Sequence, residues 1–256
     1  MRYRMLRSLA YAALGTLFTF LMTALGAATV FFFAHAACER TQRALLGFAA
    51  GVMTAASIWS LLLPAIEQAA EEGRFPPVLP AAAGVLLGTL FLVGLDALCP
   101  LLGAHGTDAY ARGDFLLMTA ITLHNIPEGM AVGLAFALAA DGEGLAGAAA
   151  LALGIGVQNF PEGAAVALPL RQMGKTRLRA FCTGTLSGAV EPLAGVAVVF
   201  AAAGAHALMP WLLSFAAGAM LCVVAEELLP RAHSRAGTCG FTAGFLLMMA
   251  LDVALG

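Results

Sequence analysis

Long apolar stretches alternate with short polar ones along almost the whole chain. A helix needs roughly 20 mostly apolar residues to cross a bilayer, and eight stretches meet that requirement. The predicted spans lie at residues 8–34, 43–66, 76–101, 114–140, 145–171, 178–204, 208–230 and 237–255. The connections between them are too short to form a separate soluble domain. We therefore predict an all-α polytopic membrane protein with eight transmembrane helices, forming a single domain over residues 1–256.

Composition agrees with a membrane protein, because 61% of the residues are hydrophobic and only 11% are charged. A soluble domain carries about 25% charged residues. The net charge of -2 and the lack of a basic block argue against nucleic acid as a partner. The cysteines number five and form no Cys-x-x-Cys pair, so we expect neither a disulfide framework nor a zinc knuckle.

The chain start also resembles a signal peptide, since basic residues precede an apolar run. That run continues to Phe33 without a clear polar cleavage region, so we expect a retained first membrane helix. Lys and Arg then predict the orientation, because short cytoplasmic loops are enriched in them. Nine lie in the loops after the odd-numbered spans and four on the other side, which places both termini outside.

Two pairs of similar segments indicate an internal repeat. "HNIPEG" at 124–129 matches "QNFPEG" at 158–163, and "FAAGVM" at 48–53 matches "FAAGAM" at 215–220. Each pair falls on predicted spans of opposite direction. An axis near the membrane plane would relate such segments, and inverted repeats around a midplane site are a common plan for secondary transporters.

Pairs of glycines four residues apart recur in the predicted spans. Small residues at this spacing let helices in lipid approach closely, so we expect tight helix contacts at these positions. The pairs are Gly47/Gly51, Gly84/Gly88, Gly129/Gly133, Gly184/Gly188 and Gly240/Gly244.

The repeated hexapeptides carry the candidate chemistry. Helical spacing places the polar residues of each motif on one face, and the two faces together offer carboxylate, imidazole and amide ligands for a divalent metal. These residues are His124, Asn125 and Glu128 in one motif and Gln158, Asn159 and Glu162 in the other. A single polar residue in a membrane helix often only bonds a neighbouring helix, but a doubled pattern favours a functional site.

Prolines accompany the acidic residues. Pro127 and Pro161 cannot donate to the carbonyls four residues earlier, so we expect kinks and freed carbonyls beside the site. Glu191 precedes Pro192 in the middle of another predicted span. This third carboxylate would help to neutralise a second cation.

"HNIPEG", "QNFPEG" and the later "EP" at 191–192 resemble the Zrt-, Irt-like (ZIP) metal transporters, and most of all their prokaryotic GufA-like branch. The resemblance covers essentially the whole chain. It implies a ZIP fold, usually homodimeric, that moves zinc and related divalent ions into the cytoplasm through its fourth and fifth helices. It also implies a place in the bacterial inner membrane.

The resemblance further implies a binuclear site with no prosthetic group. The first ion would be held by His124, Glu128, Gln158 and Glu162, with Met53 as a soft fifth ligand. The second would be held by Asn125, Glu128, Asn159, Glu162 and Glu191, so that Glu128 and Glu162 bridge the ions. The transported substrate would be Zn²⁺, with Cd²⁺, Fe²⁺, Mn²⁺ and Co²⁺ as further candidates. Some family members have aspartate where this chain has Asn159. The neutral amide of Asn159 gives the second ion position one negative charge fewer than that aspartate would.

Three alternatives stay open at this point. A membrane di-metal enzyme would suit two bridging glutamates, although such bundles use Glu-x-x-His and this motif runs His-x-x-x-Glu. A membrane metal sensor would bind ions without passing them. Met53 could be a packing residue, and the hydroxyls of Ser57, Ser60, Thr183 and Ser187 could either line a path or bond within their own helices.

Overall fold

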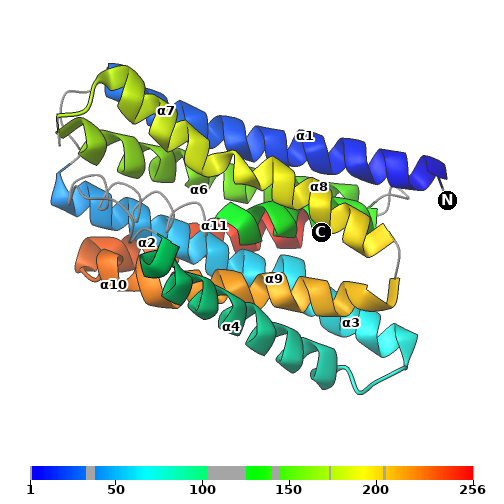
Figure 1. The fold of residues 1–256 in the computed structure, drawn as a ribbon. Helices are drawn as coiled ribbons and strands as arrows, with labels where there is room; N and C mark the ends of the chain where they lie inside the picture. Colours follow the sequence, from blue (N-terminus) through cyan, green and yellow to red (C-terminus); the bar gives the residue numbers. More distant parts are fainter. Residues whose placement is uncertain are drawn as a thin grey trace.

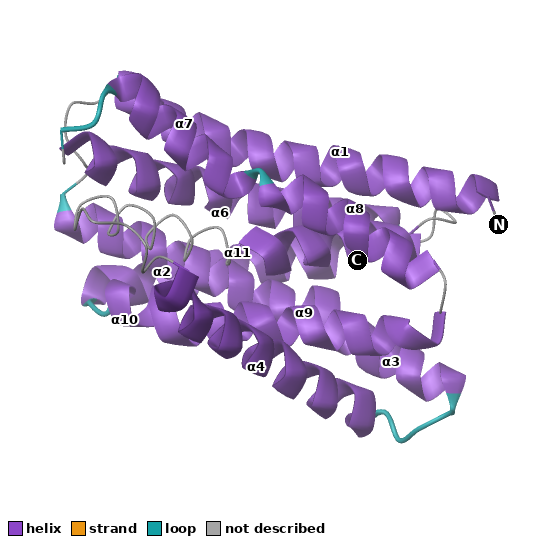
Figure 2. Ribbon diagram, in the orientation of Figure 1, coloured by secondary structure: helices purple, strands orange, loops and turns teal. Residues whose placement is uncertain are grey.

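The computed structural model describes residues 2–32, 38–102, 125–139, 144–172, 174–203 and 206–255. Every regular element in these ranges is a helix, which confirms the predicted all-α class (Figure 2). The elements are α1 (Arg2–Ala27), η1 (Ala28–Phe31), α2 (Glu39–Ala56), η2 (Ser57–Leu62), α3 (Leu63–Glu72), α4 (Val78–Leu102), the helix Asn125–Leu138, α6 (Leu145–Gln172), α7 (Arg177–Gly188), α8 (Val190–Ala203), η4 (His206–Leu208), α9 (Met209–Val223), η5 (Val224–Leu228), α10 (Leu229–Ala232) and α11 (Arg235–Leu255).

Helical segments occupy each of the eight predicted ranges. By length and apolar composition, five continuous helices in the described ranges qualify as membrane spans. They are Met5–Phe31, Glu39–Glu72, Arg177–Ala201, Met209–Ala232 and Arg235–Ala254. Val78–Gly94 and Asn125–Leu138 are shorter apolar helices. The structure therefore supports a multi-pass membrane protein, while eight complete crossings and an inverted repeat stay predictions.

The helices form a long bundle (Figure 1). In it, α1 packs against α6 and α8, α2 packs against α11, and α4 packs against α9. The main core joins α2, the Asn125–Leu138 helix, α6 and α9, and it buries Met53 and Met220 completely. Large apolar side chains point outward instead, with Leu14, Leu193 and Val253 each more than 60% exposed at 63%, 70% and 74%. Such a surface suits lipid, because water would penalise it.

The glycine pairs mark close helix contacts, as predicted. A Cβ atom added at any of the ten paired glycines would lie 2.0 to 3.0 Å from an atom of another helix. At Gly51 the nearest atom is the carbonyl oxygen of Phe241 on α11, at 2.1 Å, and at Gly88 it is that of Phe215 on α9, at 2.0 Å. Contacts this short leave no room for a side chain, so these backbones pack directly on each other.

The predicted helix 178–204 is interrupted. α7 ends at Gly188, Ala189 forms a turn in which its N–H donates to the Leu186 carbonyl at 3.1 Å, and α8 begins at Val190. Proline explains the interruption, because Pro192 has no N–H and its ring clashes with a helical carbonyl four residues earlier. In contrast, α6 continues through Pro161 as one α-helix.

Candidate metal site

The two repeated motifs meet inside the bundle. Glu128 lies in the first turns of the Asn125–Leu138 helix, and Gln158 lies in the middle of α6. The Gln158 side chain donates from Nε2 to Glu128 Oε1 at 2.6 Å, so the polar faces of the two helices are in direct contact. Both side chains are fully buried at 0% exposure, as is Asn159, while Asn125 is 1% exposed.

The glycine at the end of each motif lets a further helix pack closely against the motif helix. A Cβ at Gly129 would meet the carbonyl oxygen of Glu191 on α8 at 2.3 Å. A Cβ at Gly163 would meet the carbonyl oxygen of Thr23 on α1 at 2.0 Å. The first glycine brings the α8 carboxylate beside the motif helices, and the second brings the hydroxyls of α1.

Glu191 is held by neutral donors on several sides. Asn159 Nδ2 lies 3.0 Å from both carboxylate oxygens of Glu191 and 3.4 Å from the Thr19 carbonyl. The Thr23 hydroxyl donates to Glu191 Oε1 at 3.3 Å. Asn125 Nδ2 also donates to the Ser187 carbonyl, at 2.8 Å, just before the α7–α8 break, so five helices converge here.

Four buried oxygens at this site have no hydrogen-bond partner among the described residues. They are Asn125 Oδ1, Glu128 Oε2, Gln158 Oε1 and Asn159 Oδ1. Each amide donates its nitrogen to a protein acceptor, so it is the amide oxygen that is left over. Leaving a buried polar group unsatisfied costs roughly 1–3 kcal/mol. Four convergent acceptors without donors are a ligand set that suits a divalent cation.

Charge adds to this deficit of donors. Gln158 bonds Glu128 and its neighbour Asn159 bonds Glu191, one helical turn before Glu162 on α6, so three carboxyl groups gather at this site, where their negative charges would repel one another. Glu162 is half-buried and the other two are fully buried. A cation among them would offset the repulsion, whereas lipid or a second anion would increase it.

Two further predicted ligands are His124 and Met53. His124 lies outside the described residues. Met53 is fully buried in the main core, which leaves both of its predicted roles, packing and soft ligand, open. Within the described ranges, no group of three or more His, Cys, Asp or Glu side chains is arranged to hold a metal ion. The oxygens that converge at this site come from carboxyl and amide groups, and the amide side chains lie between the carboxyl groups.

Sequence analysis missed the contribution of α1. Thr19 and Thr23 follow each other at helical spacing of four, which places them on one face of an otherwise apolar span. That polar stripe was the signal that could have identified them. Ser187 and Ser57 bond within their own helices, to the carbonyls of Gly184 and Met53, so the intrahelical alternative is confirmed for both.

The fold and the site together define a class of protein. It is an all-helical, multi-pass membrane protein whose interior holds carboxylate and amide oxygens without a hydrogen-bond partner among the described residues.

Comparison with known proteins identifies the family. A family model described as "ZIP Zinc transporter" matches residues 104–252. The chain is 37% identical to zinc transporter ZIP11 of Homo sapiens, over 96% of this chain and 97% of the relative. It is 41% identical to zinc transporter ZIPB of Bordetella bronchiseptica, over 96% and 82%, and 40% identical to zinc transporter GufA of Myxococcus xanthus, over 77% and 81%. The chain belongs to the ZIP family of transporters, and the similarity to GufA supports the predicted branch. Its family is one of transporters, not of enzymes.

Proposed function

We propose that this chain carries divalent transition metal ions, zinc first, across the membrane into the cytoplasm. The path runs between the Asn125–Leu138 helix and α6. The observation that carries the proposal is the set of four unpaired buried oxygens on these two helices. The names of the relatives, all zinc transporters, favour zinc over other divalent ions.

The proposed site is binuclear, with Glu128 and Glu162 shared by both ions. One ion is bound by His124, Glu128, Gln158 and Glu162, with Met53 as the fifth ligand. The other is bound by Asn125, Glu128, Asn159, Glu162 and Glu191. Buried carboxylates that repel one another support the presence of positive charge between them.

In the proposed mechanism, the site replaces the water that the ion loses on leaving solution. A bare charge within lipid is costly, and oxygens already buried without partners take over its hydration shell. The ion then leaves toward the cytoplasm when the pair of motif helices moves against the surrounding helices. Backbone contacts at Gly129 and Gly163 are the surfaces along which this movement takes place.

We further propose the setting in which the transporter works. The single domain lies in the bacterial inner membrane as a homodimer, with eight spans and both termini outside. The excess of Lys and Arg in the loops after the odd-numbered spans supports this orientation.

Zinc uptake into proteoliposomes that contain a zinc-sensitive dye tests the proposal. Glu128→Gln keeps the shape of the side chain but removes its charge. We expect the initial uptake rate to fall by at least about tenfold, the size of effect that loss of a single metal-site partner produces. Zinc binding to the same protein, measured by calorimetry, should weaken in parallel.

Ser214→Ala is the matched control. Ser214 is also fully buried with an unpaired side-chain oxygen, but it lies in α9 and outside both motifs. Its uptake should stay at the wild-type rate. Wild-type protein that binds zinc in these vesicles but passes none would contradict transport and would favour a metal sensor.

A further inference from the structure

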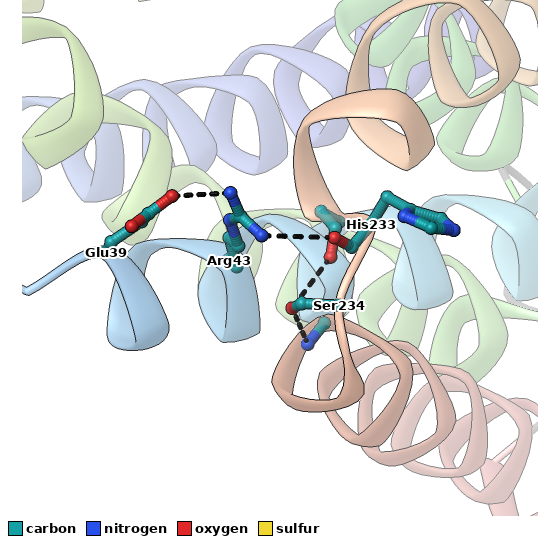
Figure 3. A network of polar contacts seen from close by, with 6 residues as sticks. Glu39, Arg43, His233 and Ser234 are labelled. Atoms are coloured by element: carbon teal, nitrogen blue, oxygen red, sulfur yellow. Dashed lines mark hydrogen bonds and ion pairs between the residues drawn. The ribbon is translucent and has the colours of Figure 1, made fainter.

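A pocket of about 360 Å³ lies at the end of the bundle where α2 and α11 begin. Its lining comes from the first turns of these two helices. The residues are Glu39, Arg40, Arg43, Ser234, Arg235 and Ala236. Figure 3 shows polar contacts beside the pocket, in which Arg43 of α2 lies between Glu39 and the His233 carbonyl, and Ser234 lies just before α11. This volume falls in the range of small-ligand sites, roughly 300–1,000 Å³.

The pocket carries a surplus of positive charge. Three arginines and one glutamate line it, which leaves a net charge of +2. Glu39 pairs with Arg43, whose Nη1 also donates to the His233 carbonyl at 3.3 Å. The guanidinium groups of Arg40 and Arg235 have no hydrogen-bond or ion-pair partner among the residues that the structure describes. Two of the three arginines at the pocket are thus left without an anionic partner in the described part of the chain.

The backbone adds to this positive character. Both α2 and α11 present their N-terminal ends to the pocket, and the unpaired N–H groups there favour an anion. Ser234 caps α11 by accepting from the Gly237 N–H at 3.0 Å, so its hydroxyl is fixed at the pocket wall.

The position of the pocket suggests the source of that anion. Glu39 and Arg235 are the first residues of two helices that qualify as membrane spans. The ends of membrane spans lie near the surface of the bilayer, where lipid phosphates are found, and the pocket is built on two such ends. Basic pockets between membrane helices bind anionic headgroups, and the arginine fork matches phosphate geometry.

We propose that this pocket binds an anionic phosphate group, supplied in the membrane by the headgroup of an anionic phospholipid. Arg40 and Arg235 hold the phosphate from the two helices, and Arg43 is oriented by Glu39 and the His233 carbonyl. A lipid bound here would link α2 to α11 at the membrane surface. This inference does not depend on metal transport.

Native mass spectrometry of the full-length protein with phosphatidylglycerol or phosphatidylcholine tests the proposal. Wild-type protein should retain phosphatidylglycerol in preference to phosphatidylcholine. Arg40→Gln/Arg235→Gln should lower the apparent affinity for phosphatidylglycerol by about 30-fold, because each basic residue near the membrane surface adds roughly fivefold. Arg40→Lys/Arg235→Lys keeps the charge and should retain most of the binding.

Arg177→Gln/Arg179→Gln is the control, since it removes two exposed arginines at the start of α7, outside the pocket. This variant should bind phosphatidylglycerol as the wild type does. Equal loss in both double variants, or no loss in either, would overturn the proposal. Another outcome is that wild type binds inorganic phosphate, Arg40→Gln/Arg235→Gln does not, and neither prefers phosphatidylglycerol. That outcome would support a phosphate site in the pocket and would overturn the lipid headgroup as the source of the phosphate.

Cys38 offers an independent measurement of occupancy. Its thiol is exposed next to the pocket, and hydrogen bonding to Thr41, aided by the charge of Arg40, lowers its pKa below the usual value. More thiolate at neutral pH means faster alkylation. Phosphatidylglycerol should slow alkylation of Cys38, by offsetting Arg40 and covering the entrance, and leave the exposed Cys182 of α7 unchanged. An unchanged Cys38 rate would count against an occupied pocket.

Discussion

At the scale of single residues, Asn159 occupies a position that a cation could also fill. Its Nδ2 donates to both carboxylate oxygens of Glu191 at 3.0 Å, so the buried carboxylate is satisfied by a neutral amide. The oxygen of the same amide has no partner in the described structure. Asn159 thus lies between the Glu191 carboxylate, which has hydrogen-bond donors, and the group of buried oxygens that have none.

Asn159→Asp tests that arrangement. The substitution places a carboxylate where Nδ2 now donates, directly against Glu191, and both groups are buried. We expect the variant without metal to unfold more easily by roughly 1–3 kcal/mol, because a donor is lost and repulsion is gained. Added Zn²⁺ should raise its melting temperature more than that of the wild type.

Asn159→Leu separates metal rescue from general damage. It removes the same donor but adds no charge, so it should destabilise the protein and gain no extra stability from Zn²⁺. If the aspartate and leucine variants responded alike to Zn²⁺, the amide would not be standing where a cation can bind.

At the scale of elements, the repeated Phe-Ala-Ala-Gly segments of α2 and α9 are followed by the same local structure. Each helix widens into a π-helical segment, η2 or η5, and each segment precedes a proline in the first turn of the next helix, Pro64 or Pro230. Proline explains the widening, because it cannot donate to the carbonyl four residues earlier. In η2 the Ser60 hydroxyl instead donates to Asp252 of α11, at 2.8 Å.

Helix contacts through glycine allow a test within one element. In α4, a Cβ at Gly88 would lie 2.0 Å from the Phe215 carbonyl oxygen, whereas a Cβ at Gly94 would meet nothing within 4 Å. Gly88→Ala should therefore destabilise the protein by about 1–3 kcal/mol through overpacking. Gly94→Ala should leave stability unchanged or raise it by up to about 1 kcal/mol, as alanine favours helices. Thermal unfolding in detergent measures both, and equal melting temperatures would contradict the direct α4–α9 contact.

At the scale of the whole molecule, the protein reverses the usual order of polarity. Its surface exposes leucine and valine, while its interior buries the carboxylates of Glu128 and Glu191. In lipid such an exterior costs little, and the expensive groups are those inside. The bundle therefore concentrates its electrostatic cost at one internal position, where a cation can offset it.

The proposed orientation makes a prediction at this scale. If both termini face outward, green fluorescent protein fused to the C-terminus should be dark when exported through the general secretion route, and alkaline phosphatase fused there should be active. The matched control is a fusion after Gly174, between α6 and α7, where basic residues predict the inner side. That fusion should give the reverse pattern. A fluorescent C-terminal fusion would contradict the orientation.

Much of this protein was predictable from sequence because the governing rules are local. Bilayer thickness sets the length of an apolar span, and a period of 3.6 residues places His124, Asn125 and Glu128 on one face before any fold is known. Glycines four residues apart likewise imply a smooth helix surface. The all-α class, the helical ranges and the motifs that mark the family follow from these rules.

Only the tertiary structure decided which distant groups meet. The sequence does not show that Thr23 of α1 donates to Glu191, that Asn125 bonds the Ser187 carbonyl just before the α7–α8 break, or that Arg40 and Arg235 border one pocket. Each contact joins residues far apart along the chain, so it depends on how whole helices pack. The sequence determined which side chains could bind a cation or an anion, and packing determined which of their atoms were left without a partner.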